Sequence, residues 1–297
     1  MTNEPNSSCS SSVLLDKLQA MEALAPAKIN LSLRILGRRD DGFHEIETFM
    51  APISIADEIR IDKRDQGQGS EFHCDDSSVP QGRENLVLRA ADLFFETTQI
   101  KSSVSIDLKK KIPHGAGLGG GSSDAAATLL ALNEIFATKL SREELARLGS
   151  TIGSDVPFFV FASPAICHGR GELVSRATLA ERLSLLLLKA DFAVPTAWAY
   201  SCWQDSHEIP EVSYASQKFR GQTFVNDLER PVFEKFVFLA ELKMWLLKQS
   251  EAGAALMSGS GSTIFAVLKG SQNANALADR ARQELDPKLW SYACETL

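Results

Sequence analysis

The sequence predicts a protein of two domains, each of which mixes strands and helices. Its 297 residues are about twice the length of a common single domain. Runs that alternate apolar and polar residues, as strands do, occur in both halves, and so do runs with helical spacing. The pattern restarts near residues 160–170, so we expect domains over residues 21–163 and 164–297.

In the first half, alternation predicts strands over residues 27–36 and 45–61, joined by a turn at residues 37–42. A third, shorter strand is predicted over residues 104–108. The polar, glycine-containing residues 65–80 between them are predicted to form a loop or a hairpin tip.

Helical spacing predicts helices over residues 86–95, 123–137 and 141–148. Ser141 suits the N-cap of the last of these, because Glu144 follows three residues later. Residues 153–161 (GSDVPFFVF) are interpreted as a turn that enters a buried strand.

In the second half, the patterns predict a strand over residues 183–190 and a strand, glycine turn and strand over residues 254–268. Helices are predicted over residues 233–247 and 274–285, whereas residues 205–222 are irregular.

Composition excludes several classes of function. Hydrophobic residues make up 44% and charged residues 23%, which is ordinary for a globular enzyme. The net charge of −7 argues against binding nucleic acid by bulk attraction, and no apolar run reaches the length of a membrane span. The five cysteines form no CxxC or zinc pattern, so we expect reduced thiols in a cytoplasmic protein. Residues 1–20 are predicted to be a disordered tail.

A loop rich in glycine and serine stands directly before the predicted helix 123–137. Residues 113–124 read PHGAGLGGGSSD. Glycines let the backbone approach a ligand closely, and the first turn of a helix favours anions. The hydroxyl groups of Ser122 and Ser123 can contact phosphate or a magnesium ion. This loop therefore predicts a phosphate-binding site.

Other interpretations of the loop are disfavoured. Gly115, Gly117 and Gly120 satisfy the dinucleotide pattern GxGxxG, but three lysines and Pro113 separate them from the preceding strand. No lysine follows the glycines, as a P-loop requires. A merely flexible turn would lose much backbone entropy at five glycines.

Three segments together resemble the motifs of the GHMP small-molecule kinases, which phosphorylate galactose, homoserine, mevalonate and related alcohols. They are residues 26–31 (PAKINL), 113–124 and 258–265 (SGSGSTIF). The resemblance implies an α+β fold whose N-terminal domain is of the ribosomal protein S5 domain 2 type and holds the nucleotide. It implies a ferredoxin-like C-terminal α/β sandwich, ATP and Mg²⁺ as cofactors, and a monomer or a weak homodimer.

Within the family, residues 26–48, 113–127 and 153–159 resemble members that act on cytidine diphosphate-linked methylerythritol. This resemblance implies phosphorylation of the C2 hydroxyl of that small molecule. A homoserine or mevalonate type of kinase, a family decarboxylase, and a non-catalytic regulator on the same fold remain as alternatives.

The resemblance also implies catalytic roles. Asp155 would orient the hydroxyl and accept its proton, with a helix cap or a turn residue as the alternative. Lys28 would pair with Asp155 and reach the transferred phosphoryl group, with an exposed strand lysine as the alternative. Asn30 would lie on the same strand face as Lys28 and bind the substrate.

The remaining implied residues contact the two ligands. His44 would bond the cytosine edge and Phe43 would stack on it, although the family pattern suggests tyrosine at position 43. Thr196 and Tyr200 would close this pocket from the second domain, unless they only pack in the core. Asn85 and Lys110 would line the adenine side, unless Lys110 ends a strand in solvent. The implied ATP-loop residues are Pro113, His114, Gly115, Ala116, Gly117, Leu118, Gly119, Gly120, Gly121, Ser122 and Ser123.

Overall fold

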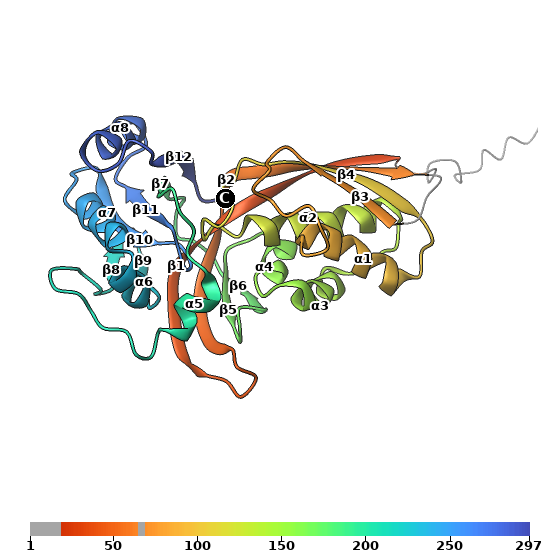
Figure 1. Ribbon diagram of the computed structural model, residues 1–297, viewed down its shortest axis with the longest axis horizontal. Helices are drawn as coiled ribbons and strands as arrows, with labels where there is room; N and C mark the ends of the chain where they lie inside the picture. Colours follow the sequence, from red (N-terminus) through yellow and green to blue (C-terminus); the bar gives the residue numbers. More distant parts are fainter. Residues whose placement is uncertain (1–18, 65–68) are drawn as a thin grey trace, which may run out of the picture.

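The computed structural model describes residues 19–64 and 69–297. Residues 1–18 of the predicted tail lie outside these described residues. Figure 1 shows two lobes side by side, with helices α1 to α4 in one and α6 to α8 in the other. Each lobe combines a sheet with helices, so the predicted mixture of strands and helices is confirmed.

The first sheet is built around a long antiparallel hairpin. Its strands β1 (Ala20–Arg38) and β2 (His44–Arg64) match the two predicted strands and the turn between them. β2 also pairs with β4 (Ser103–Lys109), and the sheet order is β3-β4-β2-β1-β9-β8. The last two strands are β8 (Gln217–Phe219) and β9 (Gln222–Asn226), with β9 parallel to β1.

Strand β3 (Gly69–Cys74) lies where a loop or a hairpin tip was predicted over residues 65–80, and it pairs in parallel with β4, so the described part of that prediction is wrong. Its residues are alternately exposed and half-buried at the edge of the sheet. An edge strand with so little buried apolar surface gives a weak sequence pattern. The irregular segment predicted at residues 205–222 likewise contains β8.

Four helices cover this sheet (Figure 1): α1 (Leu86–Thr98), α2 (Gly120–Ile135), α3 (Arg142–Ile152) and α4 (Val156–Phe161). The first three confirm the predicted helices, although α2 begins at Gly120, three residues earlier than expected. Ser141 and Glu144 form the predicted capping box of α3.

Helix α4 corrects the predicted buried strand at residues 153–161. Five of its six residues are buried, so the sequence lacks the exposed face that distinguishes a helix from a buried strand. Pro157 stands in the first turn, where a helix tolerates proline because that N–H has no partner within the helix.

The second sheet has the order β10-β11-β7-β12, with every neighbour antiparallel. Its strands are β7 (Ser184–Lys189), β10 (Ala252–Met257), β11 (Thr263–Leu268) and β12 (Trp290–Glu295). Helices α7 (Val237–Leu247) and α8 (Ala274–Glu284) lie on one face. The predicted helix 233–247 is divided at Phe236 between α6 (Glu229–Lys235) and α7.

The two sheets share a buried layer. Along β7, Leu185 and Leu187 pack with Ile29 and Leu31 of β1, whereas Leu188 packs with the α7 and α8 side. Strand β7 is therefore apolar on both faces. The hairpin of β5 (Ala165–His168) and β6 (Leu173–Arg176) follows the predicted domain boundary at residues 163 and 164, yet it pairs with β2 of the first sheet. The boundary between the two domains stays a prediction. Within the described ranges, no helix is both long and apolar enough to cross a membrane.

Candidate active site

A cavity of about 810 Å³ brings together nearly all of the residues predicted for the site. Residues 113–122 line it, and the predicted catalytic and substrate residues line it as well. The exception is Ser123, which the structure does not bring to the cavity. Residues that line the cavity but were missed from the sequence include Arg38, Thr48, Asp124, Ser154, Arg170, Gly259 and Ser260.

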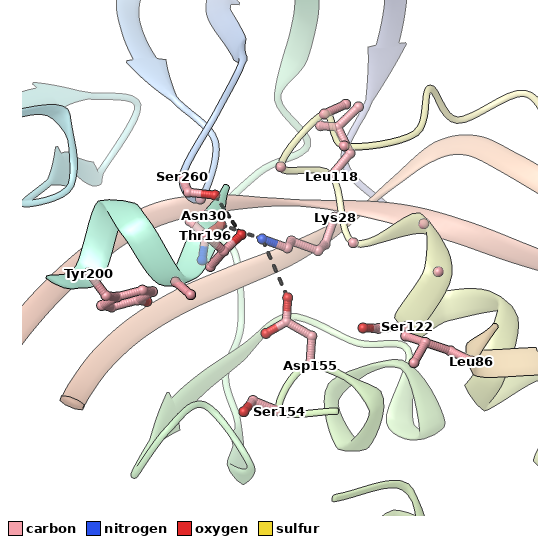
Figure 2. Close-up of a pocket in the computed structure, with 18 of the residues that line it drawn as sticks. Lys28, Asn30, Leu86, Leu118, Ser122, Ser154, Asp155, Thr196, Tyr200 and Ser260 are labelled. Carbon is pink, nitrogen blue, oxygen red and sulfur yellow. Dashed lines mark hydrogen bonds and ion pairs between the residues drawn. The ribbon is translucent and has the colours of Figure 1, made fainter. Parts of the chain in front are cut away.

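Lys28 and Asp155 face each other at the centre of this cavity (Figure 2). Lys28 lies on β1 and Asp155 is the N-cap of α4, and their charged groups are 3.6 Å apart. The Lys28 side chain is almost completely buried, whereas the Asp155 side chain is 33% exposed. A substrate can therefore reach the Asp155 carboxylate, whereas the Lys28 ammonium group is buried within the protein.

Asn30 and Thr48 hold the Lys28 ammonium group. Lys28 Nζ donates a hydrogen bond of 2.6 Å to Asn30 Oδ1, and Asn30 Nδ2 donates to Thr48 Oγ1 at 2.8 Å. The Thr48 hydroxyl in turn donates to the carbonyl of Ser32. Both ends of the Asn30 amide are thus occupied within the protein. Thr48 was missed because only the pairing of β1 with β2 places it beside Asn30.

The glycine loop is fixed by close contacts with the rest of the chain. Gly117 has φ +74°, and a Cβ atom there would lie 2.2 Å from the carbonyl oxygen of Ser258. Ser258 Oγ also donates to the Gly117 carbonyl at 2.9 Å. On the other side, the Lys28 N–H donates to the Leu118 carbonyl at 2.9 Å. The loop therefore lies between β1 and the turn after β10.

Helix α2 begins at the end of this loop, with Gly119 in the left-handed region at φ +72° as its N-cap. Ser122, in the first turn, lines the cavity. Ser123 is buried instead and donates from its hydroxyl to the Pro26 carbonyl at 2.7 Å. Ser123 thus ties α2 to β1 and presents no hydroxyl to the cavity.

Lys110 directly follows β4, and its side chain lies in the protein interior, not in solvent. Its ammonium group contacts Asp57 and, at 2.9 Å, Asp124. Burial lowers the pKa of Lys110, but the two carboxylates outweigh this effect and raise it overall. Burial also raises the pKa of Asp124, whose Oδ1 is buried without a hydrogen-bond partner among the described residues.

Asn85 lines the same end of the cavity, but its side chain caps α1. Its Oδ1 accepts from the Val87 N–H at 2.8 Å, and its Nδ2 donates to the Pro80 carbonyl. Both polar atoms are thus used within the protein. The cavity wall here is largely apolar, with the side chains of Val79, Pro80, Leu86, Val87 and Leu108.

An aromatic group forms the opposite end. The rings of His44 and Tyr200 are stacked with centroids 5.4 Å apart, and Trp203 meets His44 edge-on. Burial, with a smaller effect of Arg38, lowers the pKa of His44 and favours its neutral form. Burial also raises the pKa of Tyr200, which remains a neutral phenol.

Two further contacts complete this end of the cavity. Phe43 is 49% exposed and lies under the guanidinium group of Arg170, 4.7 Å from its ring centroid. The hydroxyl groups of Thr196 and Ser260 are 2.9 Å apart (Figure 2). Thr196 thereby connects α5 (Thr196–Ser201) to the turn between β10 and β11.

Comparison with known proteins decides the family. Two family models match: GHMP kinases N terminal domain over residues 85–163, and GHMP kinases C terminal over residues 215–286. The 4-diphosphocytidyl-2-C-methyl-D-erythritol kinase of Methylacidiphilum infernorum is 42% identical over 285 residues, covering 93% of this chain and 97% of the relative. The chain belongs to the GHMP kinase family. A second relative of this GHMP kinase comes from Citrifermentans bemidjiense and carries the same name as the first relative. It is 38% identical over 85% of this chain and 91% of the relative.

Solved structures confirm the two-domain α+β fold expected of a GHMP kinase. A crystal structure of 4-(cytidine 5'-diphospho)-2C-methyl-D-erythritol kinase has a TM-score of 0.74 and 35% identity, covering 93% of this chain and 99% of that chain. Homoserine kinase from Cytophaga hutchinsonii has the same fold, with a TM-score of 0.69, 18% identity, and coverage of 94% and 95%. This GHMP kinase is therefore an ATP-dependent small-molecule kinase.

Proposed function

We propose that this kinase transfers the γ-phosphoryl group of ATP to the C2 hydroxyl of 4-diphosphocytidyl-2-C-methyl-D-erythritol. The products are the 2-phosphate and ADP, and the reaction belongs to the non-mevalonate isoprenoid pathway. One observation carries the proposal: a single cavity contains the His44–Tyr200 aromatic pair, the Lys28–Asp155 pair and the glycine loop. The names of the relatives give the substrate that fits these three parts.

The cavity suits ATP at the glycine loop. The backbone of residues 115–121 and the first turn of α2 offer N–H groups to the phosphates, and the apolar wall next to Lys110 suits adenine. Among the described residues, no group of three acidic, histidine or cysteine side chains could hold a metal by itself. Mg²⁺ at such sites keeps several waters and is bound in large part by the substrate's phosphates. The Ser122 hydroxyl, which lines the cavity, would be one of its protein ligands.

Asp155 and Lys28 act on the reacting atoms. The substrate hydroxyl oxygen forms a bond to the γ-phosphorus, and the bond from that phosphorus to the oxygen of ADP breaks. Asp155 orients the hydroxyl and accepts its proton, while Lys28 stabilises negative charge on the transferred group. Phosphoryl transfer depends mainly on positioning and charge stabilisation, which suits a carboxylate already paired with an ammonium group. ATP with Mg²⁺ supplies the phosphoryl group and neutralises its charge.

The aromatic end selects the substrate. Neutral His44 offers both a donor and an acceptor to the edge of cytosine. Phe43 and Tyr200 supply ring faces for stacking, and phenylalanine at position 43 retains the stacking without a hydroxyl group. Thr196 closes the pocket from α5, although its hydroxyl is shared with Ser260.

Assembly and location follow from the same residues. One chain supplies every part of the cavity, so activity requires no second copy, and we propose a monomer or a weak homodimer. The cysteines of the described residues, Cys74, Cys167, Cys202 and Cys294, are free thiols, which supports a reducing, cytoplasmic location.

A coupled assay of ADP release tests the proposal, with 4-diphosphocytidyl-2-C-methyl-D-erythritol, homoserine and mevalonate offered separately. We expect ADP release with the cytidine-bearing alcohol alone. Turnover of homoserine or mevalonate in its place would make the protein another kind of GHMP kinase. Release of CO2 would indicate a decarboxylase, and no turnover of any alcohol would favour a regulator.

A further inference from the structure

We propose that Arg170, assisted by Arg38, binds the diphosphate group of the cytidine-bearing substrate. The assignment rests on the proposed function and adds the residues that recognise the charged middle of that substrate. Both arginines line the cavity, and they come from different parts of the first sheet: Arg38 ends β1, and Arg170 lies in the turn between β5 and β6.

Arg170 lies between the two functional ends of the cavity. Its guanidinium group covers the ring of Phe43 at 4.7 Å, next to the cytosine end. The following residue, Gly171, approaches the catalytic carboxylate, because a Cβ atom on Gly171 would lie 3.7 Å from Asp155 Oδ1. A diphosphate joins the cytidine to the reacting alcohol, so it must cross the space that Arg170 borders.

The Arg170 guanidinium is oriented but not neutralised by a close ion pair. Glu172 approaches its Nε at 3.8 Å and accepts a hydrogen bond of 2.6 Å from the Arg170 backbone N–H. The nearby Asp41 also interacts with its charge. Within the described ranges, the two Nη groups of Arg170 donate no hydrogen bond, and Glu172 is the one ion-pair partner of the guanidinium group. The fork of these two Nη groups matches two phosphate oxygens, and the Phe43 ring beneath the guanidinium group fixes the plane of that group.

Arg38 adds a second available cation. It pairs with His44 across the β1–β2 turn, and its charge helps lower the pKa of His44. The adjacent Arg39 contrasts with it, because Arg39 binds Asp41 at 3.2 Å and Glu45 at 2.7 Å. In the described part of the chain, Arg38 forms no such pair. The turn therefore neutralises one arginine and leaves the other available at the cavity.

Charge balance supports the same assignment. A diphosphate diester carries about two negative charges, and the protein itself has a net charge of −7. Entry of such a group therefore requires local cations. Lys28 and the start of α2 lie at the phosphoryl-transfer end, which leaves Arg38 and Arg170 for the substrate's own phosphates.

Calorimetric titration of the full-length protein with CDP, CMP and cytidine, without ATP, tests the assignment. The variants are Arg170→Gln and Arg38→Gln. Arg176→Gln is the matched control, because Arg176 ends the same hairpin and covers the ring of Phe161 at 5.7 Å without lining the cavity. We expect Arg170→Gln to weaken CDP binding about ten-fold or more, and cytidine binding much less. Arg38→Gln should show a smaller loss, and Arg176→Gln none.

Steady-state kinetics supply a second measurement. In Arg170→Gln, the KM for the cytidine-bearing alcohol should rise while the KM for ATP stays the same. An unchanged ratio of CDP to cytidine affinity would overturn the assignment. If both affinities fall equally, the effect lies on the base through Phe43. If the unmodified protein binds no cytidine compound, the proposed substrate itself is wrong and the assignment falls with it. Tight CDP binding that is insensitive to both arginines overturns the assignment alone.

Discussion

Lys28 connects three separate parts of the active site. Its ammonium group donates to Asn30 and faces Asp155, and its backbone N–H binds the glycine loop at Leu118. The distance of 3.6 Å to Asp155 is longer than a close ion pair, and the aspartate side chain is partly exposed. The ammonium group therefore retains the capacity to attract a further anion, as a phosphoryl-transfer site requires.

Removal of either charge should abolish most of the turnover. We expect Asp155→Asn and Lys28→Met each to lower kcat by about 10² to 10⁴-fold, because a positioned proton acceptor and a charge-stabilising group are lost. ATP binding, measured by calorimetry, should persist. Asp191→Asn serves as control, because Asp191 is exposed and does not line the cavity. Near-normal activity of Asp155→Asn would refute the assigned role.

The proposed role of His44 predicts a defined pH dependence of substrate binding. The pKa of His44 lies below the ordinary value of 6.5, because burial and Arg38 disfavour the charged imidazole. Substrate affinity measured without ATP should therefore stay constant from about pH 8 to 6.5 and fall at lower pH, as His44 becomes protonated. In His44→Gln the affinity should be weaker and should lack this acidic loss. If both proteins lose affinity in parallel, another group is responsible.

At the scale of elements, the sequence predicts most strands and helices, because long alternating or helical runs report which face is buried. It fails where that signal is missing. Helix α4 is buried nearly all round, and β3 buries almost nothing. The structure brings the residues of the predicted motifs to one cavity, with the exception of Ser123, but the assigned roles stay predictions. Thr48 and Arg170 reach the cavity through strand pairing and turn geometry, which no local pattern contains. Ser123 shares its motif with Ser122, yet helix geometry turns it toward β1.

The link between β4 and α2 contains a buried charge cluster whose loss should destabilise the fold. Lys110→Met leaves Asp57 and Asp124 buried without their cation, so unfolding in urea should show a loss of about 3–5 kcal/mol. Burial raises the pKa of Asp124, so ionising it costs stability as the pH rises, and the variant should weaken further in that direction.

Lys111→Met is the matched control for this experiment. Lys111 is the next residue, and its ion pair with Glu58 is exposed, so its loss should change stability little. Equal destabilisation by both substitutions would show that the buried cluster has no special role. The same comparison, repeated with ATP present, reports whether the cluster also supports the nucleotide end.

At the scale of the whole molecule, residues 295–297 connect the two lobes. The Thr296 hydroxyl is fully buried and accepts from the Leu183 N–H at 3.0 Å. Thr296 also forms a bridge with Ile53 of β2, and the Leu297 N–H donates to the Pro52 carbonyl. The end of the second sheet is thus attached to the middle of the first, beside the layer that both sheets bury.

Thr296→Val should loosen this connection while keeping its shape. The substitution leaves the Leu183 N–H buried without an acceptor, which costs about 1–3 kcal/mol in unfolding free energy. Thr296→Ser keeps the acceptor oxygen and should be closer to the unmodified protein. A valine variant as stable as the unmodified protein in thermal and urea unfolding would show that this hydrogen bond contributes nothing to joining the lobes.

The close approach of Gly117 to Ser258 has a consequence for protein synthesis. The ribosome makes the glycine loop long before the turn that supports it, because 140 residues separate Gly117 from its first contact in that turn. A nascent chain that has emerged only as far as Met257 contains Lys28 and Asp155 but lacks this support. Domains fold as units while the chain lengthens. The glycine loop therefore gains this support only after the turn has been synthesised, and we expect ATP to stabilise chains that include the turn more than chains that end before it.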